Sequence, residues 1–130
     1  MVNADFLDPS YKIPGGGWLS SAEDLARFEV ALLTDRLVRR ATRDVMWTPL
    51  KPSDGSEDTY GLGWGVVKNA SVTEVAHSGS QQGTSTDTVL APDQRAGVVV
   101  LINTEDVGAS SLAKELMKIV LGPAGNKPQN

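Results

Sequence analysis

The sequence contains no cysteine and one histidine, and aromatic residues make up only 5% of its 130 residues. Without cysteine the chain cannot form a disulfide, a cysteine-ligated zinc site or an iron–sulfur cluster, and it has no thiol nucleophile. A metal site built on His77 is also disfavoured, because such a site needs several ligands and the chain has no second histidine. We therefore expect neither a metal ion nor a cofactor.

Positive charge is scarce as well. The chain carries 12 lysines and arginines against 16 acidic residues, a net charge of −4, and Arg39-Arg40 is its one basic cluster. Binding to nucleic acid through phosphate neutralisation needs the opposite sign, so we expect no nucleic-acid partner. The longest apolar run, 98–102, is far too short to span a membrane. The first residues lack the basic and apolar regions of a signal peptide, which leaves the compartment open.

Hydrophobic residues make up 40% of the chain, enough for one folded domain over 1–130. We divide this domain into a loop with a helical segment (1–50), a sheet with a C-terminal helix (60–121) and a polar tail (122–130). The predicted order is one or two N-terminal helices, consecutive strands and a last helix. This order indicates an α+β fold with an antiparallel sheet of about four strands.

Two helices are predicted in the first half of the chain. Ser20 and Ser21 are N-cap candidates, because each has an acidic residue three positions later, and apolar spacing extends the helix over 21–34. Glu29 lies inside the apolar face of this helix, and we expect its long side chain to extend along the edge toward water. A second, short helix is predicted over about 40–47.

Alternating hydrophobicity then predicts four strands, at 61–67, 72–77, 84–91 and 96–103. The last strand is apolar on both faces, so we expect it to be central in the sheet and covered on both sides. A final helix is predicted over about 110–121, with an apolar face formed by Leu112, Leu116, Ile119 and Val120 and flanked by Ala113 and Met117.

Two short motifs contain residue types that are used in catalysis. Ser111 and Lys114 have the spacing S-x-x-K, which at a helix start places a lysine one turn from a serine that it could deprotonate. N-capping is the simpler role for a serine at this position. His77-Ser78-Gly79 ends the second predicted strand, where His77 taken alone is a polar residue at a strand end. His77 and Ser78 cannot act as base and nucleophile, because adjacent strand residues point to opposite faces.

Several segments, in this order and spacing, resemble the C-terminal part of the serine beta-lactamase and penicillin-binding-protein superfamily, especially its class-C-like and esterase-like branch. The resemblance covers roughly residues 13–121. The segments are Pro14-Gly15-Gly16-Gly17-Trp18-Leu19-Ser20-Ser21-Ala22-Glu23-Asp24-Leu25-Ala26-Arg27-Phe28, Met46-Trp47-Thr48-Pro49, Tyr60-Gly61-Leu62-Gly63-Trp64-Gly65, His77-Ser78-Gly79 with Gly83, and Gly97-Val98-Val99-Val100-Leu101-Ile102-Asn103.

That family carries three motifs: S-x-x-K, then Y-x-N or S-x-N, then K-T-G or H-x-G. Only the third is present in its place, as His77-Ser78-Gly79, because no tyrosine or serine has an asparagine two residues on. The S-x-x-K match at Ser111 lies at the wrong end of the family's fold. The resemblance therefore implies a C-terminal fragment or truncated product of a serine hydrolase, inactive alone because its nucleophile is missing.

By the same resemblance, His77 takes the place of the family's lysine, which orients the substrate and moves protons, and Ser80 supplies one backbone N–H of the oxyanion hole. The implied catalytic residues are His77, Ser78, Gly79 and Ser80, with Ser111 and Lys114 as weak candidates for a nucleophile pair. Near pH 7 histidine carries less positive charge than lysine, which weakens recognition of a substrate carboxylate. The implied substrates are beta-lactams, D-amino-acid peptides or esters, and the family would fit a periplasmic or secreted parent.

A second interpretation is a non-catalytic binding or interaction module that kept the sheet and lost the chemistry. In the family, strands from the N-terminal end of the domain complete the sheet, and this chain alone would leave apolar surface uncovered. We expect either that helix 21–34 folds over this surface or that chains self-associate through the exposed sheet.

Overall fold

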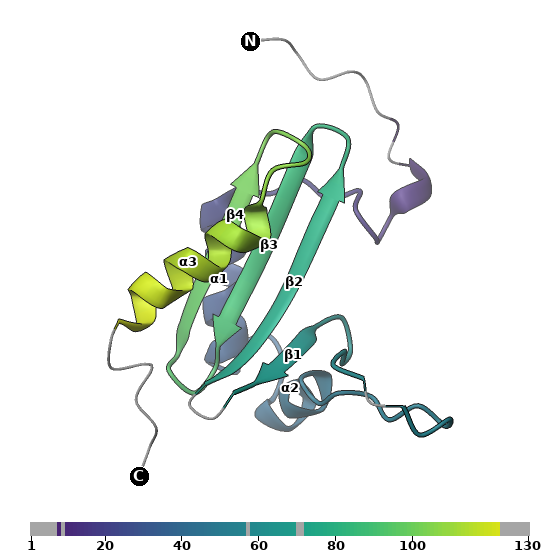
Figure 1. Ribbon diagram of the computed structural model, residues 1–130, viewed down its shortest axis with the longest axis vertical. Coiled ribbons are helices and arrows are strands. Elements are labelled where there is room, and N and C mark those ends of the chain that lie inside the picture. The colour runs from purple at the N-terminus through teal and green to yellow at the C-terminus, as the bar shows by residue number, and fades with distance from the viewer. Residues whose placement is uncertain (1–7, 9, 57, 70–71, 123–130) are drawn as a thin grey trace.

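The fold is an antiparallel sheet between helices, seen in a computed structural model that describes residues 8, 10–56, 58–69 and 72–122 (Figure 1). The strand order is β1-β2-β3-β4. The α+β prediction is confirmed. The elements are a 3₁₀ turn Ser10–Lys12, α1 Ala22–Leu33, α2 Arg40–Met46, β1 Gly65–Lys68, β2 Thr73–Gln81, β3 Thr84–Ala91, β4 Ala96–Ile102 and α3 Ala109–Leu121.

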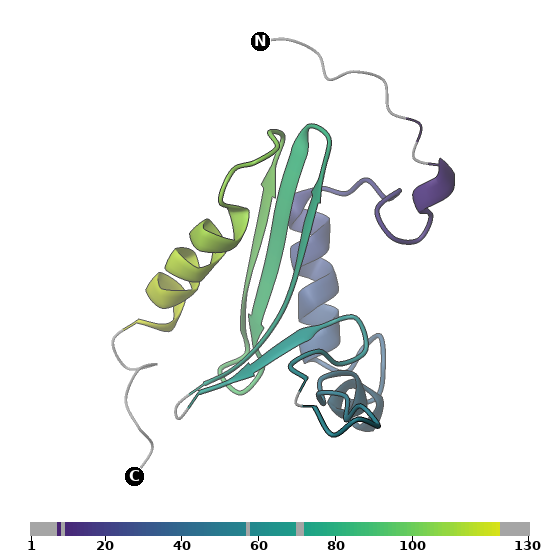
Figure 2. The same cartoon turned by 45° about the vertical axis from the view of Figure 1, so that its right-hand side comes forward.

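The sheet separates two hydrophobic clusters. Figure 2 shows α3 on one face of the sheet and α1 on the other. Val89, Val98 and Val100 pack with α3 in the first cluster. Val75 and Leu90 pack with Leu32 of α1 and with both Trp47 and Trp64 in the second. None of the described helices has both the length and the apolar character that crossing a membrane requires.

The N-terminus of α1 follows the sequence signal. Ser21 is the N-cap, and its hydroxyl oxygen accepts a hydrogen bond from the backbone N–H of Asp24 at 3.1 Å. At the other end of α1, the guanidinium of buried Arg43 donates to the carbonyl of Leu32 at 3.0 Å and to Asp35 at 2.6 Å. Arg43 thereby ties α2 to the C-terminus of α1, where backbone carbonyls lack helical partners.

The prediction that the first strand covers 61–67 is wrong, because β1 covers Gly65–Lys68. Residues 61–64 form a turn in which the N–H of Gly61 donates to the carbonyl of Trp64 at 2.7 Å. Gly63 has φ +79°, which is left-handed and ends any extended strand there. The alternation of glycine with apolar residues thus came from a turn that buries Trp64, not from a strand with a glycine face.

The second strand is longer than predicted and runs to Gln81. Gln81 pairs with Thr84, so two residues join β2 to β3. Gly83 in this turn has φ +72°, a left-handed backbone conformation that glycine adopts without strain. The second half of β2 is polar and therefore lacks the hydrophobic alternation that predicts a strand. It is extended because it pairs with β3.

The prediction that 96–103 is central is wrong, whereas the prediction that it is covered on both sides is confirmed. β4 lies at one end of the strand order, and among the described residues no strand pairs with its outer side. One face of β4 packs against α3 and the other against α1. Both faces of β4 are apolar because a helix covers each of them. As expected, the helix predicted over 21–34, which is α1, folds over one face of the sheet.

The apolar face predicted for the last helix is partly wrong, because Ala113 and Met117, expected at its flank, form the centre of the buried face. The residues of α3 buried against the sheet are Ala109, Ala113 and Met117. Two alanines one turn apart let the helix approach the sheet closely, which leaves the larger side chains beside the contact. Leu112, Leu116, Ile119 and Val120 are between 36% and 75% exposed.

Glu29 contradicts the expectation that its side chain reaches water. It is only 4% exposed, and its Oε1 atom has no hydrogen-bond partner among the described residues. The niche exists because Gly97 of β4 has no side chain: a Cβ there would lie 2.6 Å from Glu29 Oε2. Burial raises the pKa of Glu29 to about 7, since removing a carboxylate from water disfavours its charged form.

The predicted polar tail 122–130 lies outside the described residues after Gly122.

Candidate functional site

The third-motif segment lies on β2, and alternate residues of this strand face opposite sides of the sheet. Val75 pairs with Leu90 in the cluster next to α1, so His77 and Gly79 face that same side. Ser78 pairs with Asp87 and faces α3. The register places the side chains of His77 and Ser78 on opposite faces of the sheet, as expected for adjacent strand residues, so the two cannot act as base and nucleophile.

The edge of β2 is open where the motif lies. β1 pairs with β2 only through Thr73–Ala76, and among the described residues no strand pairs with β2 beyond Ala76 on that side. His77, Gly79 and Ser80 are all exposed. An open strand edge presents unpaired backbone groups, to which an extended ligand can bind as an added strand.

Thr86 of β3 leaves no room for a side chain at Gly79. A Cβ at Gly79 would lie 2.8 Å from Oγ1 of Thr86, whose hydroxyl donates to the carbonyl of Gly79 at 3.3 Å. Thr86 therefore lies over the glycine and fixes this part of the backbone. The absence of a side chain keeps the face beside His77 open.

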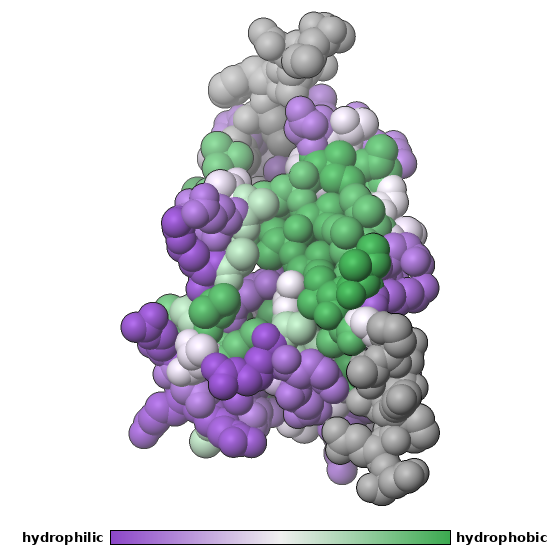
Figure 3. All heavy atoms as spheres, turned by 90° about the vertical axis from the view of Figure 1, so that its left-hand side faces the viewer, coloured by the Kyte–Doolittle hydropathy of each residue, from purple (hydrophilic) through white to green (hydrophobic). Residues whose placement is uncertain are grey.

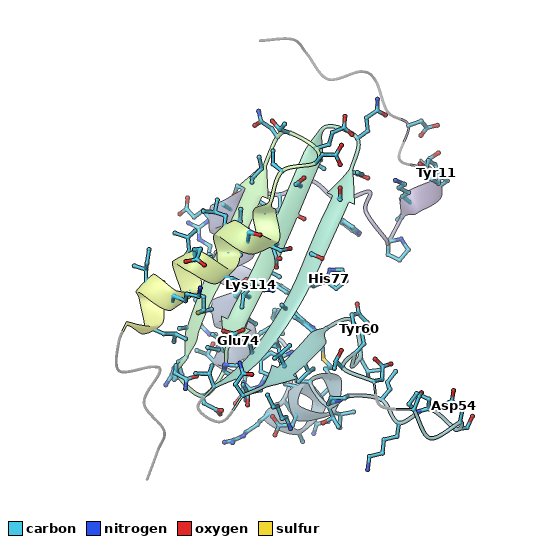
Figure 4. The ribbon with its side chains drawn as sticks, viewed as in Figure 1. Tyr11, Asp54, Tyr60, Glu74, His77 and Lys114 are labelled. Carbon is cyan, nitrogen blue, oxygen red and sulfur yellow. The ribbon has the colours of Figure 1, made fainter. Side chains whose placement is uncertain are left out.

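Tyr60 is the aromatic neighbour of His77. The two rings lie 6.3 Å apart at 60°, an edge-to-face arrangement, and Figure 4 shows both side chains on the open side of β2. Tyr60 is held in place because its carbonyl accepts a hydrogen bond from the N–H of Leu50 at 2.9 Å. Tyr60 belongs to the glycine-rich segment, but no sequence pattern indicates that this ring contacts His77.

Ser111 and Lys114 lie on the opposite face of the sheet from His77. Both are exposed, and both line a shallow hollow between α3 and β2 that also includes Asn69 and Glu74. Figure 4 shows Lys114 and Glu74 on the α3 side of the sheet. Ser111 also lines a second hollow on this face, together with Ser78, Gly79 and Ser80. The structure thus brings Ser111 near the third motif, but not Lys114, and His77 faces the other side of the sheet.

The glycine-rich segment before α1 reaches the far end of β2. The side-chain amide of Gln81 donates to the carbonyl of Gly16 at 3.3 Å, a contact between residues 65 positions apart. This contact places the glycine-rich loop beside the end of β2. The sequence analysis did not predict it. Within the described ranges, no group of three or more His, Asp or Glu side chains could hold a metal ion.

Comparison with known proteins finds a matching family and several relatives. Residues 1–120 match the family model described as Beta-lactamase. Penicillin-binding protein 4* of Bacillus subtilis is 33% identical over 97 residues, which is 72% of this chain and 21% of that protein. The human serine beta-lactamase-like protein LACTB, mitochondrial, is 27% identical over 155 aligned positions, which is 89% of this chain and 28% of that protein.

Solved structures agree on the fold. An octameric penicillin-binding protein homologue from Pyrococcus abyssi superposes with a TM-score of 0.69 and 26% identity, over 84% of this chain and 26% of that chain. A penicillin-binding protein from Bacillus halodurans gives a TM-score of 0.64 at 22% identity, over 75% of this chain and 30% of that chain, and shows the fold alone. The chain spans between about a fifth and a third of the length of each of these proteins. Because the Beta-lactamase model matches residues 1–120 and the sheet superposes on that of a penicillin-binding protein homologue, the chain belongs to the beta-lactamase family of serine hydrolases.

Proposed function

We propose that this chain is the part of a beta-lactamase-like serine hydrolase that supplies the His77 wall of the active site, and that it is inactive alone. The observation that supports this is the exposed face of His77 and Gly79 beside the open edge of β2. The substrates are beta-lactams, D-amino-acid peptides or esters. An extended substrate with an amide or acyl group can hydrogen-bond along that edge.

Each residue has a defined role in this proposal. His77 orients the bound substrate and moves a proton, with the ring of Tyr60 limiting the positions of the imidazole. The backbone N–H of Ser80 is one of two donors to the oxyanion of the tetrahedral intermediate. The second donor and the nucleophilic serine come from outside this chain. Without that serine no acyl-enzyme forms.

The first test is the intact mass of the chain after incubation with a penicillin and, separately, with a fluorophosphonate. We expect no mass increase from either reagent on a sample that circular dichroism shows to be folded. The Bacillus subtilis relative, treated in parallel, is the positive control for the reagents. A stoichiometric adduct on this chain would overturn the proposed inactivity and would direct attention to Ser111.

The role of His77 is tested in a chimera, in which this chain replaces the matching C-terminal segment of the Bacillus subtilis relative. We expect the chimera to react with the fluorophosphonate, His77→Ala to lower the rate about a hundredfold, and His77→Lys to restore most of it. Glu74→Gln is the matched control, because Glu74 lies on the same strand but faces α3. A His77→Ala chimera that is folded and fully reactive would contradict the role. If the chimera does not fold, the same variants are compared after mixing this chain with the remaining segment.

We also propose that the chain self-associates. The Pyrococcus abyssi homologue is described as octameric, and β4 of this chain has an open outer edge among the described residues. An open strand edge favours pairing with another chain.

A further inference from the structure

The hydroxyl oxygen of Thr88 is buried and has no hydrogen-bond partner among the described residues. A buried hydroxyl without a partner costs free energy, so its position needs an explanation. This chain spans only about a fifth to a third of the length of its relatives. Further chain can cover an exposed surface, such as the broad hydrophobic area in Figure 3, but it cannot reach an atom that these residues already bury. The partner of this hydroxyl therefore comes from this chain.

Thr88 lies directly opposite His77 where β3 pairs with β2. The two side chains share the face of the sheet next to α1, because Val75 and Leu90, two residues further along each strand, both pack with α1. Directly opposed residues of an antiparallel pair have Cβ atoms about 4.5–5.5 Å apart, so side-chain rotation alone brings a threonine hydroxyl to a histidine ring nitrogen. Hydrogen bonds in active sites are often open until substrate binds.

The other described strand residues around Thr88 on this face do not compete with His77. The hydroxyl of Thr86 already donates to the carbonyl of Gly79 at 3.3 Å. The carboxyl of Glu29 lies on this side of the sheet too, but it fills the niche at Gly97, which is diagonal to Thr88 rather than opposite. Diagonal neighbours are about 7–8 Å apart. The remaining neighbours have apolar side chains: Val75, Leu90, Val99 and Leu101.

The imidazole of His77 thus has a neighbour on each side. Tyr60 pairs with Gly65 at the start of β1, and its ring contacts the imidazole edge-to-face from that side (Figure 4). Thr88 lies on the β3 side. An aromatic contact limits where the imidazole lies but does not decide which ring edge turns outward, whereas a hydrogen bond to one nitrogen does.

We infer that Thr88 is a positioning residue for His77, whose hydroxyl donates a hydrogen bond to Nδ1 of the neutral imidazole. This inference rests on the role proposed for His77 above and names the group that fixes its ring. Nδ1 is the ring nitrogen nearer the backbone, so it is the one that a hydroxyl at the sheet surface reaches. With its lone pair occupied, the proton stays on Nε2. Nε2–H, at the outer end of the ring, is then the donor that faces a bound substrate.

Nitrogen NMR of the full chain tests the contact directly, because His77 is its only histidine and gives one pair of ring nitrogen signals. At a pH where the ring is neutral, we expect the Nδ1 signal of a hydrogen-bond acceptor. Thr88→Val should shift this signal toward that of a free imidazole, and Thr88→Ser should retain it. Thr84→Val is the matched control on the same face of β3, because the Thr84 hydroxyl already donates to the carbonyl of Ile102 at 3.0 Å. It should leave the signal unchanged.

The effect on the reaction is measured with the fluorophosphonate in the chimera or the mixture described above. We expect Thr88→Val to lower the rate about tenfold and Thr88→Ser to keep it. A purely structural role gives the opposite order, because valine retains the shape and strand preference of threonine whereas serine loses a buried methyl group. In the His77→Ala background, Thr88→Val should have no further effect, since Thr88 acts through His77.

The outcomes separate this inference from the proposed function. An Nδ1 signal that Thr88→Val does not change would overturn the contact, whatever the rate of the chimera. A changed signal with a full rate would overturn the positioning role and leave that of His77 intact. A rate that Thr88→Val still lowers in the His77→Ala background would show that Thr88 acts through another group. A full rate for His77→Ala itself would overturn the proposed role of His77 and the positioning role with it.

Discussion

At pH 8 the Glu29→Gln variant is expected to be about 3 kcal/mol more stable to unfolding than the original chain, and near pH 4 the two should be about equally stable. The cause is the burial of the Glu29 carboxyl between α1 and the sheet, where Oε1 has no hydrogen-bond partner among the described residues. Glutamine has a similar shape and, like the protonated acid, carries no charge.

The direction of the pH dependence follows from the raised pKa. Glu29 has a pKa of about 7 in the folded chain, against an ordinary value of 4.5. Below the lower value the carboxyl is protonated in both states, so its ionisation contributes nothing to the free energy of unfolding. As the pH rises between the two values, the unfolded chain loses this proton first, so the free energy of unfolding falls by about 1.4 kcal/mol per pH unit. Above about pH 7 this contribution becomes constant.

Urea unfolding of both chains at several pH values between 4 and 8 measures this difference. The matched control is Glu23→Gln, on the same helix, because Glu23 is exposed and pairs with Arg27 at the surface. Exposed pairs of this kind contribute about 0.2–1 kcal/mol, so the control should change stability little. If the Glu29→Gln chain kept the same pH dependence as the original, the carboxyl would have to be hydrated in solution.

Glu29 also shows how far the sequence could predict the structure. Its place on the apolar face of α1 could be read from helical spacing, but its burial could not. Burial depends on Gly97, which lies 68 positions later and leaves a niche opposite the carboxyl. The capping of α1 by Ser21 was predictable for the opposite reason, because the cap and its partner Asp24 are three residues apart.

The candidate site divides in the same way. Period-two alternation was enough to place His77 and Ser78 on opposite faces, because it is a local property of any strand. The contact between Tyr60 and His77 and the open edge of β2 could not be predicted, because each depends on residues far apart in the sequence. The open edge exists because β1 pairs only as far as Ala76, and the length of β1 is limited by the turn at 61–64.

That turn leads to the second large effect: Gly61→Ala should destabilise the chain by about 3 kcal/mol or more. A Cβ at Gly61 would lie 2.2 Å from the carbonyl oxygen of Met46 and 3.0 Å from that of Thr48. Both are backbone atoms, so no side-chain rotation relieves the overlap. The oxygen of Met46 also accepts a hydrogen bond from the N–H of Leu62 at 2.9 Å, which a displaced turn would lose.

The same displacement should reach the site. Trp64 packs edge-to-face against Trp47 at 6.2 Å, and the turn connects Tyr60 to β1, so moving it disturbs the core and the neighbour of His77 together. Thermal unfolding measures the loss of stability, and the tryptophan fluorescence of the folded state reports the Trp47–Trp64 contact. Gly15→Ala is the matched control, because its nearest atom would be 3.7 Å away. Equal stability of the two variants would mean that the turn is not packed against the end of α2, and the geometry that holds Tyr60 beside His77 would then have to come from elsewhere in the chain.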